Sequence, residues 1–204
     1  TADVEAFWRT GELNAESNVQ FGEGGAGAFS DGKLTTLIKN IRCHQVLEIL
    51  VAHGAPADIR YSHQPHVGTD ILKQVVKSMR EQIIALGGQV RFEAKVTELL
   101  MTGGQLSGVV INGSERLYAQ AVILAVGHSA RDTFAKLVEQ GIEVMPKAFA
   151  IGVRVEHPQQ MISDSQYGQF AQFLPPADYK LTHLAKNGRH VYTFCMCPGG
   201  DVVA

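Results

Sequence analysis

Long apolar runs, net charge and cysteine are all scarce in this sequence. No apolar run approaches the ~20 residues that a membrane-spanning helix requires, so no membrane segment is predicted. The formal net charge is only -2, without a long run of lysine or arginine, which argues against a protein that binds nucleic acid electrostatically. The three cysteines, Cys43, Cys195 and Cys197, are too few and too unevenly spaced for a disulfide framework. We therefore expect a reduced, cytoplasmic setting.

The composition that remains is that of an ordinary globular protein, with 45% hydrophobic and 19% charged residues. The start of the chain, from Thr1 to Trp8, has neither the basic residues nor the apolar core of a signal peptide. It reads as the interior of a longer sequence, and we expect a piece of a larger protein.

One stretch in the middle of the chain predicts a strand, a turn and a helix in succession. The six apolar residues of Ala121–Val126 predict a strand that is buried on both faces. Gly127 ends this strand, and the capping-box spacing of Ser129 and Asp132 predicts a helix that runs to residue 140. Ligands of open α/β sheets collect beyond the carboxyl ends of strands, where Gly127 and His128 stand. An ordinary connection without a ligand is the alternative interpretation.

A second stretch, near the start of the chain, is rich in glycine. Gly22, Gly24 and Gly27 satisfy the pattern G-x-G-x-x-G, but the dinucleotide fingerprint requires a full strand before it and a helix at it. Neither is predicted here, so we interpret the match as accidental. A glycine-rich loop nevertheless exposes backbone N–H groups that can cradle phosphate, to which Ser30 and Lys33 would add a hydroxyl and a charge. A loop that binds no ligand is the alternative.

Periodicity predicts further elements between these two stretches. Apolar spacing favours one or two helices within residues 35–53, and a helix from Thr69, as its cap, to Leu86. Four strand-length runs follow, at residues 89–92, 95–101, 106–111 and 116–120. Because Gly103-Gly104 and Asn112-Gly113 punctuate them, the last three runs are predicted to form an antiparallel meander.

The remaining part of the chain is predicted to contain two strands separated by a long loop. Within residues 148–157 the apolar side chains alternate, which places Arg154 and Glu156 together on the polar face. Arg154 could hold a substrate carboxylate in a two-pronged manner, or could pair with Glu156 at the surface. Residues 159–186 show no strong periodicity and are expected to form an extended loop.

The last predicted strand, residues 191–197, carries Cys195 and Cys197 on one face. The two residues could pack beneath a sheet, or a thiolate could stand beside a redox cofactor. A zinc site with His183 and His190 can be imagined, but the spacing matches no standard module, so no metal is predicted.

Four blocks in this order resemble a specific family. They are the glycine-rich stretch of residues 18–34, then Pro65–Asp70, Gly127–Asp132 and Cys195–Gly200. They resemble the FAD-dependent dehydrogenases of the glutathione-reductase-like flavoprotein superfamily, over nearly the whole chain. The resemblance implies an α/β fold, with part of a Rossmann-like FAD-binding domain and its antiparallel β-meander over residues 1–147. It implies part of a mixed α+β substrate domain over residues 148–204.

The resemblance also implies which residues meet the cofactor and the substrate. Cofactor contacts are expected, some through the backbone, from Gly24, Gly25, Ser30, Lys33, Val96, Gly127, His128, Cys197, Gly199 and Gly200. Val96 would meet the adenine, while Gly127 and His128 would approach the dinucleotide. Arg154 is the first candidate for substrate contact and His66 the second.

The implied function is that of an FAD-dependent oxidoreductase, which moves electrons between bound flavin and a small organic substrate. A non-catalytic ligand-binding or interaction module with the same fold is the alternative. A hydrolase built on His128 and Ser129 is not predicted, because adjacent residues point in different directions and no G-x-S-x-G elbow exists. Family members begin with a strand and a true G-x-G-x-x-G unit and close with a further glycine-rich segment. Neither is found here, so we expect this chain alone to be inactive and to bind FAD weakly or not at all.

Overall fold

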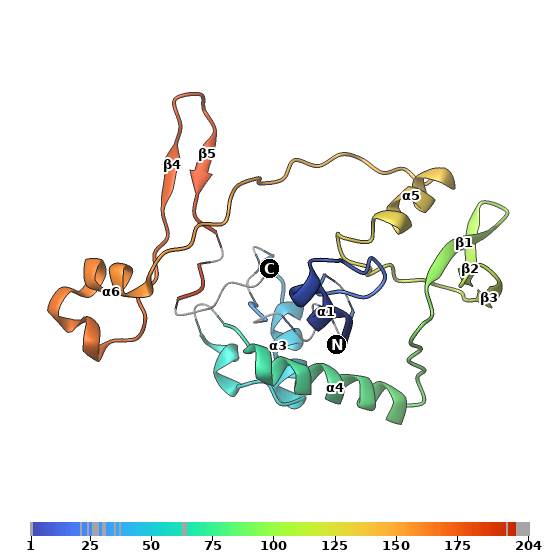
Figure 1. Cartoon of the computed structure of the whole chain (residues 1–204). Coiled ribbons are helices and arrows are strands. Elements are labelled where there is room, and N and C mark those ends of the chain that lie inside the picture. The colour runs from blue at the N-terminus through green and yellow to red at the C-terminus, as the bar shows by residue number, and fades with distance from the viewer. Residues whose placement is uncertain are drawn as a thin grey trace. The chain divides into compact units, whose positions relative to one another are not determined.

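The structure is a computed structural model that describes residues 2–20, 22–23, 25, 29, 32–34, 36, 38–62, 65–194 and 196–198. Contacts within the chain define two units, Thr1–Pro146 and Lys147–Ala204, and each is described by itself. The first unit contains α1 (Ala2–Thr10), α3 (Arg42–Ala52), η1 (Ala57–Arg60), α4 (Thr69–Ala85), β1 (Val96–Thr102), β2 (Gln105–Ile111), β3 (Glu115–Tyr118) and α5 (Arg131–Glu139), as Figure 1 shows. The second contains α6 (Gln159–Tyr167), η2 (Gly168–Phe173), β4 (Thr182–Leu184) and β5 (His190–Tyr192).

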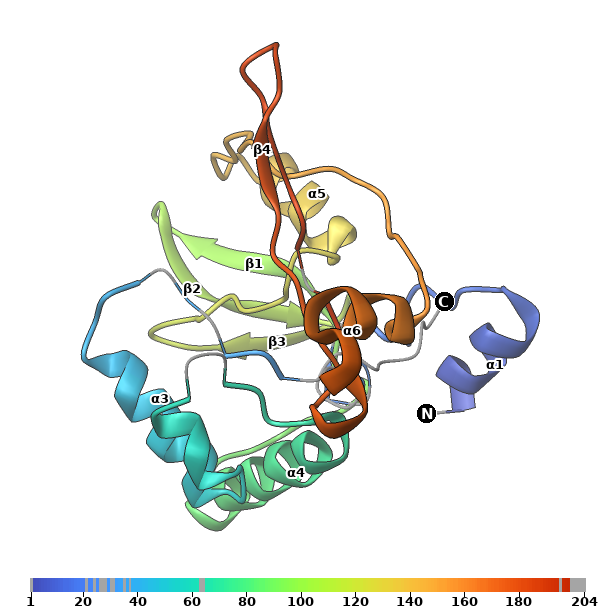
Figure 2. The ribbon, with the colours of Figure 1, turned by 90° about the vertical axis from the view of Figure 1, so that its left-hand side faces the viewer.

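The main apolar core of the first unit joins α3, η1 and α4, which lie close together in Figure 2. Val75 of α4 is fully buried, and it clusters with Ala55, Ile59 and Val67. Partly buried apolar residues surround this cluster, namely Leu34, Leu47, Leu50, Val51, Ile71, Leu72 and Met79. The apolar stripe predicted for α4 is therefore a core face along its first turns, whereas Ile83 is 48% exposed.

The predicted helix from Thr69 is confirmed as α4, but its predicted cap is wrong. The N-cap is Gly68 at φ 91°, and no side chain caps the helix. Thr69 is already the first helical residue, because the left-handed backbone of Gly68 turns the chain into the helix one residue earlier. Asp70 does lie in the first turn, where the helix dipole favours a negative charge.

The predicted meander is confirmed as a three-stranded antiparallel sheet in the order β1-β2-β3. Its turns follow from the residues between the strands, since Gly103, Gly104, Asn112 and Gly113 all have positive φ. The strand predicted at residues 89–92 is wrong, because these residues have no ladder partner in the described part of the chain.

Two predicted strands are absent from the described structure. Residues 121–126 form no strand, and Ile123 is 92% exposed instead of buried. Residues 148–157 are also unpaired, with Phe149 and Ile151 83% and 89% exposed. A strand requires a neighbour for its backbone hydrogen bonds, and the described residues offer none to either segment.

Helix boundaries elsewhere differ from the predicted ones for local reasons. The helix predicted from Ser129 begins at Arg131, after an N-cap at Ala130 that has no side-chain hydrogen bond. The Ser129 hydroxyl lies 3.4 Å from His128 Nδ1 and the Asp132 carboxylate contacts Lys95, so neither group closes a capping box. Residues 35–53 contain one described helix, α3, and α1 was not predicted.

The second unit contains regular structure where the sequence predicted a loop. Helix α6 follows Pro158, and its buried Ser163 bonds to the backbone N–H of Ala177 at 3.3 Å. Gln159 donates to the backbone oxygen of Ala177 at 2.8 Å. The strand predicted at residues 191–197 is shorter, since β5 ends at Tyr192 and pairs with β4 in an antiparallel hairpin. Cys195 lies outside the described residues.

Across the ranges that the structure describes, no helix has the length and apolar character needed to cross a membrane.

The packing of β2 against β3 makes Gly108 a test of the meander. A Cβ at this position would collide with the backbone oxygen of Leu117 and lie 2.9 Å from the Cα of Tyr118. Backbone atoms of a paired strand cannot yield cheaply, so we expect Gly108→Ala to lower the free energy of unfolding by about 1–3 kcal/mol. Chemical denaturation measures this loss. Gly152→Ala is the matched control, because nothing lies within 4 Å of a Cβ there, and an equal loss in both variants would contradict the assignment.

Candidate functional site

Two of the four blocks that resemble flavoproteins lie against each other in the first unit. Lys33, after the glycine-rich loop, forms an isolated antiparallel bridge with His66. The N–H of Leu34 donates to Pro65 O at 2.9 Å, and the N–H of Val67 donates to Gly32 O at 3.2 Å. The structure thus brings together one predicted cofactor residue, Lys33, and one predicted substrate residue, His66.

Gly32 allows this close approach. Its φ is +65°, and a Cβ added there would lie 3.1 Å from Val67 Cβ and 3.5 Å from Leu72 Cδ2. Val67 is only 2% exposed and belongs to the core beside α4. The end of the glycine-rich loop therefore packs on the core at Gly32, where any residue with a side chain would be strained.

Charged and aromatic contacts hold the start of the same loop against α4. Arg80 Nε donates to both carboxylate oxygens of Glu23, at 3.0 and 2.9 Å. The ammonium of Lys73 lies 5.1 Å from the ring centre of Phe29, and Trp8 meets that ring edge-on at 5.3 Å. Gly25, which lies between Glu23 and Phe29 in the sequence, is buried. These contacts attach Glu23 and Phe29 of the loop to α4.

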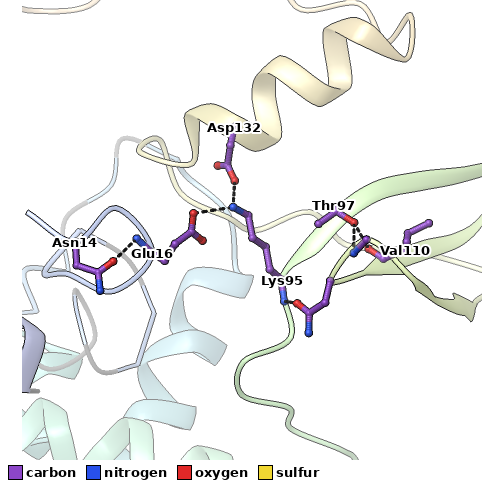
Figure 3. A network of polar contacts seen from close by, with 8 residues as sticks. Asn14, Glu16, Lys95, Thr97, Val110 and Asp132 are labelled. Carbon is purple, nitrogen blue, oxygen red and sulfur yellow. Dashed lines mark hydrogen bonds and ion pairs between the residues drawn. The ribbon is translucent and has the colours of Figure 1, made fainter.

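A second group of predicted residues lies around the start of β1. Lys95 Nζ contacts Asp132 Oδ2 at 2.7 Å and Glu16 Oε1 at 2.8 Å, as Figure 3 shows. The hydrogen bond to Asp132 raises the pKa of Lys95 most, and the one to Glu16 raises it further. The same Lys95–Asp132 hydrogen bond lowers the pKa of Asp132. Both groups therefore keep their charges throughout the neutral pH range. Val96 follows Lys95 directly in the chain.

Val96 lines a shallow depression of about 170 Å³ on this surface. The other lining residues are Lys95, Thr97, Asp132, Thr133 and Lys136. Gly127 has φ +72° and nothing within 4 Å of a built Cβ, so its backbone is open to a ligand. His128 is exposed, and within the described contacts its ring faces the hydroxyl of Ser129.

The remaining predicted site residues lie in the second unit or outside the described residues. Arg154 and Cys197 belong to the second unit, which is described separately from the first. Gly24, Ser30, Gly199 and Gly200 lie outside the described residues. No cluster of three or more His, Cys, Asp or Glu side chains suited to a metal occurs in the part of the chain that is described.

Sequence reasoning missed two polar arrangements. The bridge from Lys95 to Glu16 and Asp132 joins residues far apart in the chain, and no local pattern signals it. In the second unit, His157 Nε2 lies 2.8 Å from the hydroxyl of Tyr179, with the ring centres 5.6 Å apart. His157 Nδ1 is buried and has no hydrogen-bond partner among the described residues. The lone histidine before Pro158 was the only sequence signal for this pair.

Comparison with known proteins relates the chain to FAD-dependent proteins. Residues 148–204 match the family model described as FAD-dependent protein, C-terminal domain-like. An uncharacterized protein of Clostridium beijerinckii is 54% identical over 207 residues, which cover 100% of this chain and 39% of the relative. A digeranylgeranylglycerophospholipid reductase of Haloferax volcanii is 29% identical over 148 residues, which cover 72% of this chain and 34% of the relative.

The chain thus spans well under half the length of either curated relative. The family match and the distant reductase together support a relationship with FAD-dependent oxidoreductases. They do not confirm the glutathione-reductase-like superfamily that the sequence blocks resemble.

The contact of Gly32 with the core predicts that substitution of Gly32 destabilises the protein more than substitution of Gly22. Both residues have left-handed backbones, at φ +65° and +78°, but only Gly32 faces a close neighbour. We expect Gly22→Ala to cost about 1–2 kcal/mol from backbone strain alone. Gly32→Ala should cost about 1 kcal/mol more, because buried Val67 must shift as well. Urea denaturation of the two variants measures the difference, and equal losses would show that the Gly32 contact does not seat the loop.

Proposed function

We propose that this chain is part of an FAD-dependent oxidoreductase that transfers electrons between bound flavin and a small organic substrate. The match of residues 148–204 to the FAD-dependent C-terminal family carries the proposal. The Haloferax relative supports it, because its name is that of a reductase. The identity of that relative's substrate is not transferred to this chain, which covers only 34% of it.

The residues of the first unit fit a dinucleotide in one specific respect. A dinucleotide must approach the backbone closely, and Gly127 offers an open backbone directly before the exposed His128. In the proposal, Gly127 and His128 contact the dinucleotide and Val96 contacts the adenine. Lys33, Gly24, Gly25 and Ser30 cradle its phosphates, and Cys197, Gly199 and Gly200 contribute from the second unit.

Bound FAD would supply the electron transfer itself, while the protein binds and orients the reacting groups. For this reason the proposal needs no catalytic triad or metal cluster. Arg154 remains the first candidate to hold a substrate carboxylate, since a guanidinium presents two parallel donors. His66 remains the second, and its bridge to Lys33 places it beside a proposed phosphate contact.

The proposal is tested on the complete protein purified under mild conditions. We expect visible flavin absorbance, release of FAD on denaturation, bleaching by dithionite and reoxidation by an added electron acceptor. Bound FAD that no acceptor reoxidises after enzymatic or chemical reduction would favour the non-catalytic module. Absence of any bound or bindable FAD would contradict the oxidoreductase and favour the non-catalytic module. We expect the 204-residue chain by itself to bind FAD weakly and to lack activity.

The open backbone at Gly127 gives a sharper prediction. Asparagine tolerates left-handed backbone, so Gly127→Asn should fold while its side chain occupies the space that the dinucleotide needs. We expect the dissociation constant for FAD to rise about tenfold or more, equivalent to at least about 1.4 kcal/mol. Titration monitored by flavin fluorescence measures it.

Gly141→Asn is the matched control for this substitution. Gly141 also has a left-handed backbone, at φ +78°, and open space around a built Cβ, but it follows α5 and has no proposed cofactor contact. Its affinity for FAD should stay at the wild-type value. Equal affinities in both variants would remove Gly127 from the proposed site.

A further inference from the structure

We propose that Lys95 and Asp132 are positioning residues, which hold the turn at residues 127–129 at a fixed distance from Val96. The proposal rests on the proposed function, because it concerns two proposed contacts of the dinucleotide. Lys95 directly precedes Val96, and Asp132 lies in the first turn of α5, directly after the turn that carries Gly127 and His128. The 2.7 Å ion pair between Lys95 and Asp132 therefore connects the residue before Val96 with the helix that follows Gly127 and His128.

The same ammonium also reaches a third segment. Glu16, which lies beyond the end of α1, contacts Lys95 Nζ at 2.8 Å, and Figure 3 shows the two carboxylates approaching the ammonium from different segments. The backbone of Lys95 is itself fixed, because its N–H donates to Asn112 Oδ1 at 2.9 Å and its carbonyl accepts from Asn112 N at 2.8 Å. The ammonium thus extends from an anchored point of the meander.

A second contact ties the other end of α5 to the same strand. The side chain of Gln140, the C-cap of α5, accepts from Leu99 N at 3.0 Å and donates to Leu99 O at 2.8 Å. Because β1 is at the edge of the three-stranded sheet, the amide of Gln140 takes the place of a neighbouring strand. Helix α5 is therefore held at its start by Lys95, which directly precedes β1, and at its end by Leu99 of β1, and Leu137 between these two contacts in the sequence is buried.

The exposure of these groups argues for a positional role. The side chains of Lys95 and Asp132 are 42% and 54% exposed, and that of Glu16 is 67% exposed. Solvent-exposed ion pairs add little to overall stability. They can still select one arrangement of segments, because residues 121–127 before the turn form no strand ladder with the described residues.

The first test measures FAD affinity in variants of the complete protein. We expect Lys95→Met to raise the dissociation constant for FAD about tenfold, a typical coupling between a supporting contact and a ligand site. The melting temperature should stay within about 3 °C of the wild-type value, because the lost pairs are exposed. Lys95→Arg should restore most of the affinity, since a guanidinium can pair with both carboxylates.

Lys77→Met is the matched control. Lys77 belongs to α4 and does not line the depression around Val96, and its ammonium pairs at 3.8 Å with Glu81 of its own helix. This variant removes one positive charge and one exposed ion pair from the first unit and leaves the contacts of α5 intact. Its affinity for FAD should equal that of the wild type, whereas a loss equal to that of Lys95→Met would show a general charge effect and overturn the proposal.

The second test needs no cofactor and uses the nearly isosteric variant Asp132→Asn. Hydrogen exchange of the backbone amides from 127 to 131 should become faster in Lys95→Met and in Asp132→Asn, and should not change in Lys77→Met. The double variant should exchange no faster than Lys95→Met alone, because Lys95→Met already removes the ion pair that Asp132→Asn weakens. Unchanged exchange in both single variants would overturn the proposal.

The two tests separate this inference from the proposed function. A wild-type protein that binds no FAD overturns both. A wild-type protein that binds FAD, with unchanged affinity in Lys95→Met, overturns the positioning role alone. Weaker FAD binding by Lys95→Met with rescue by Lys95→Arg, together with the expected exchange pattern, supports it.

Discussion

The burial of Val75 against Ala55, Ile59 and Val67 is the contact on which the first unit depends. It fixes α4 relative to α3 and η1, and it also fixes the chain just before α4, because Val67 belongs to the same cluster. The glycine-rich loop is then held from two directions, by the backbone pairing at Lys33 and by the ion pair of Glu23 with α4. An apolar cluster thus helps to fix the position of the described residues of this loop.

The parts of the fold that were predicted correctly are those with a local cause. Helix α4 follows from its apolar period, and the meander follows from strand-length runs together with the turns at Gly103-Gly104 and Asn112-Gly113, whose residues adopt positive φ. The Lys33–His66 pairing has no such local signal, since each residue lies in a segment without clear periodicity. The resemblance to a family indicated both segments as candidates, but only the structure shows that they meet.

The wrong predictions concern elements that need distant partners. Residues 121–126 and 148–157 have strand-like patterns, but a strand is defined by hydrogen bonds to a neighbour, and the described residues supply none. Helix α6 is the opposite case, because its sequence is weakly amphipathic and its packing rests on polar contacts of Gln159 and Ser163 with Ala177. Patterning within a segment carries no information about such long-range contacts.

Two glycines with the same backbone conformation show how a structural position differs from a candidate ligand position. Gly32 and Gly127 have φ values of +65° and +72°, so backbone geometry alone favours glycine at both. A side chain at Gly32 would meet buried Val67, which explains that glycine through folding alone. A side chain at Gly127 would meet nothing among the described atoms, and asparagine would satisfy the same φ. Packing within the described chain therefore excludes a side chain at Gly32, whereas at Gly127 only the left-handed backbone disfavours one, as it does at Gly141.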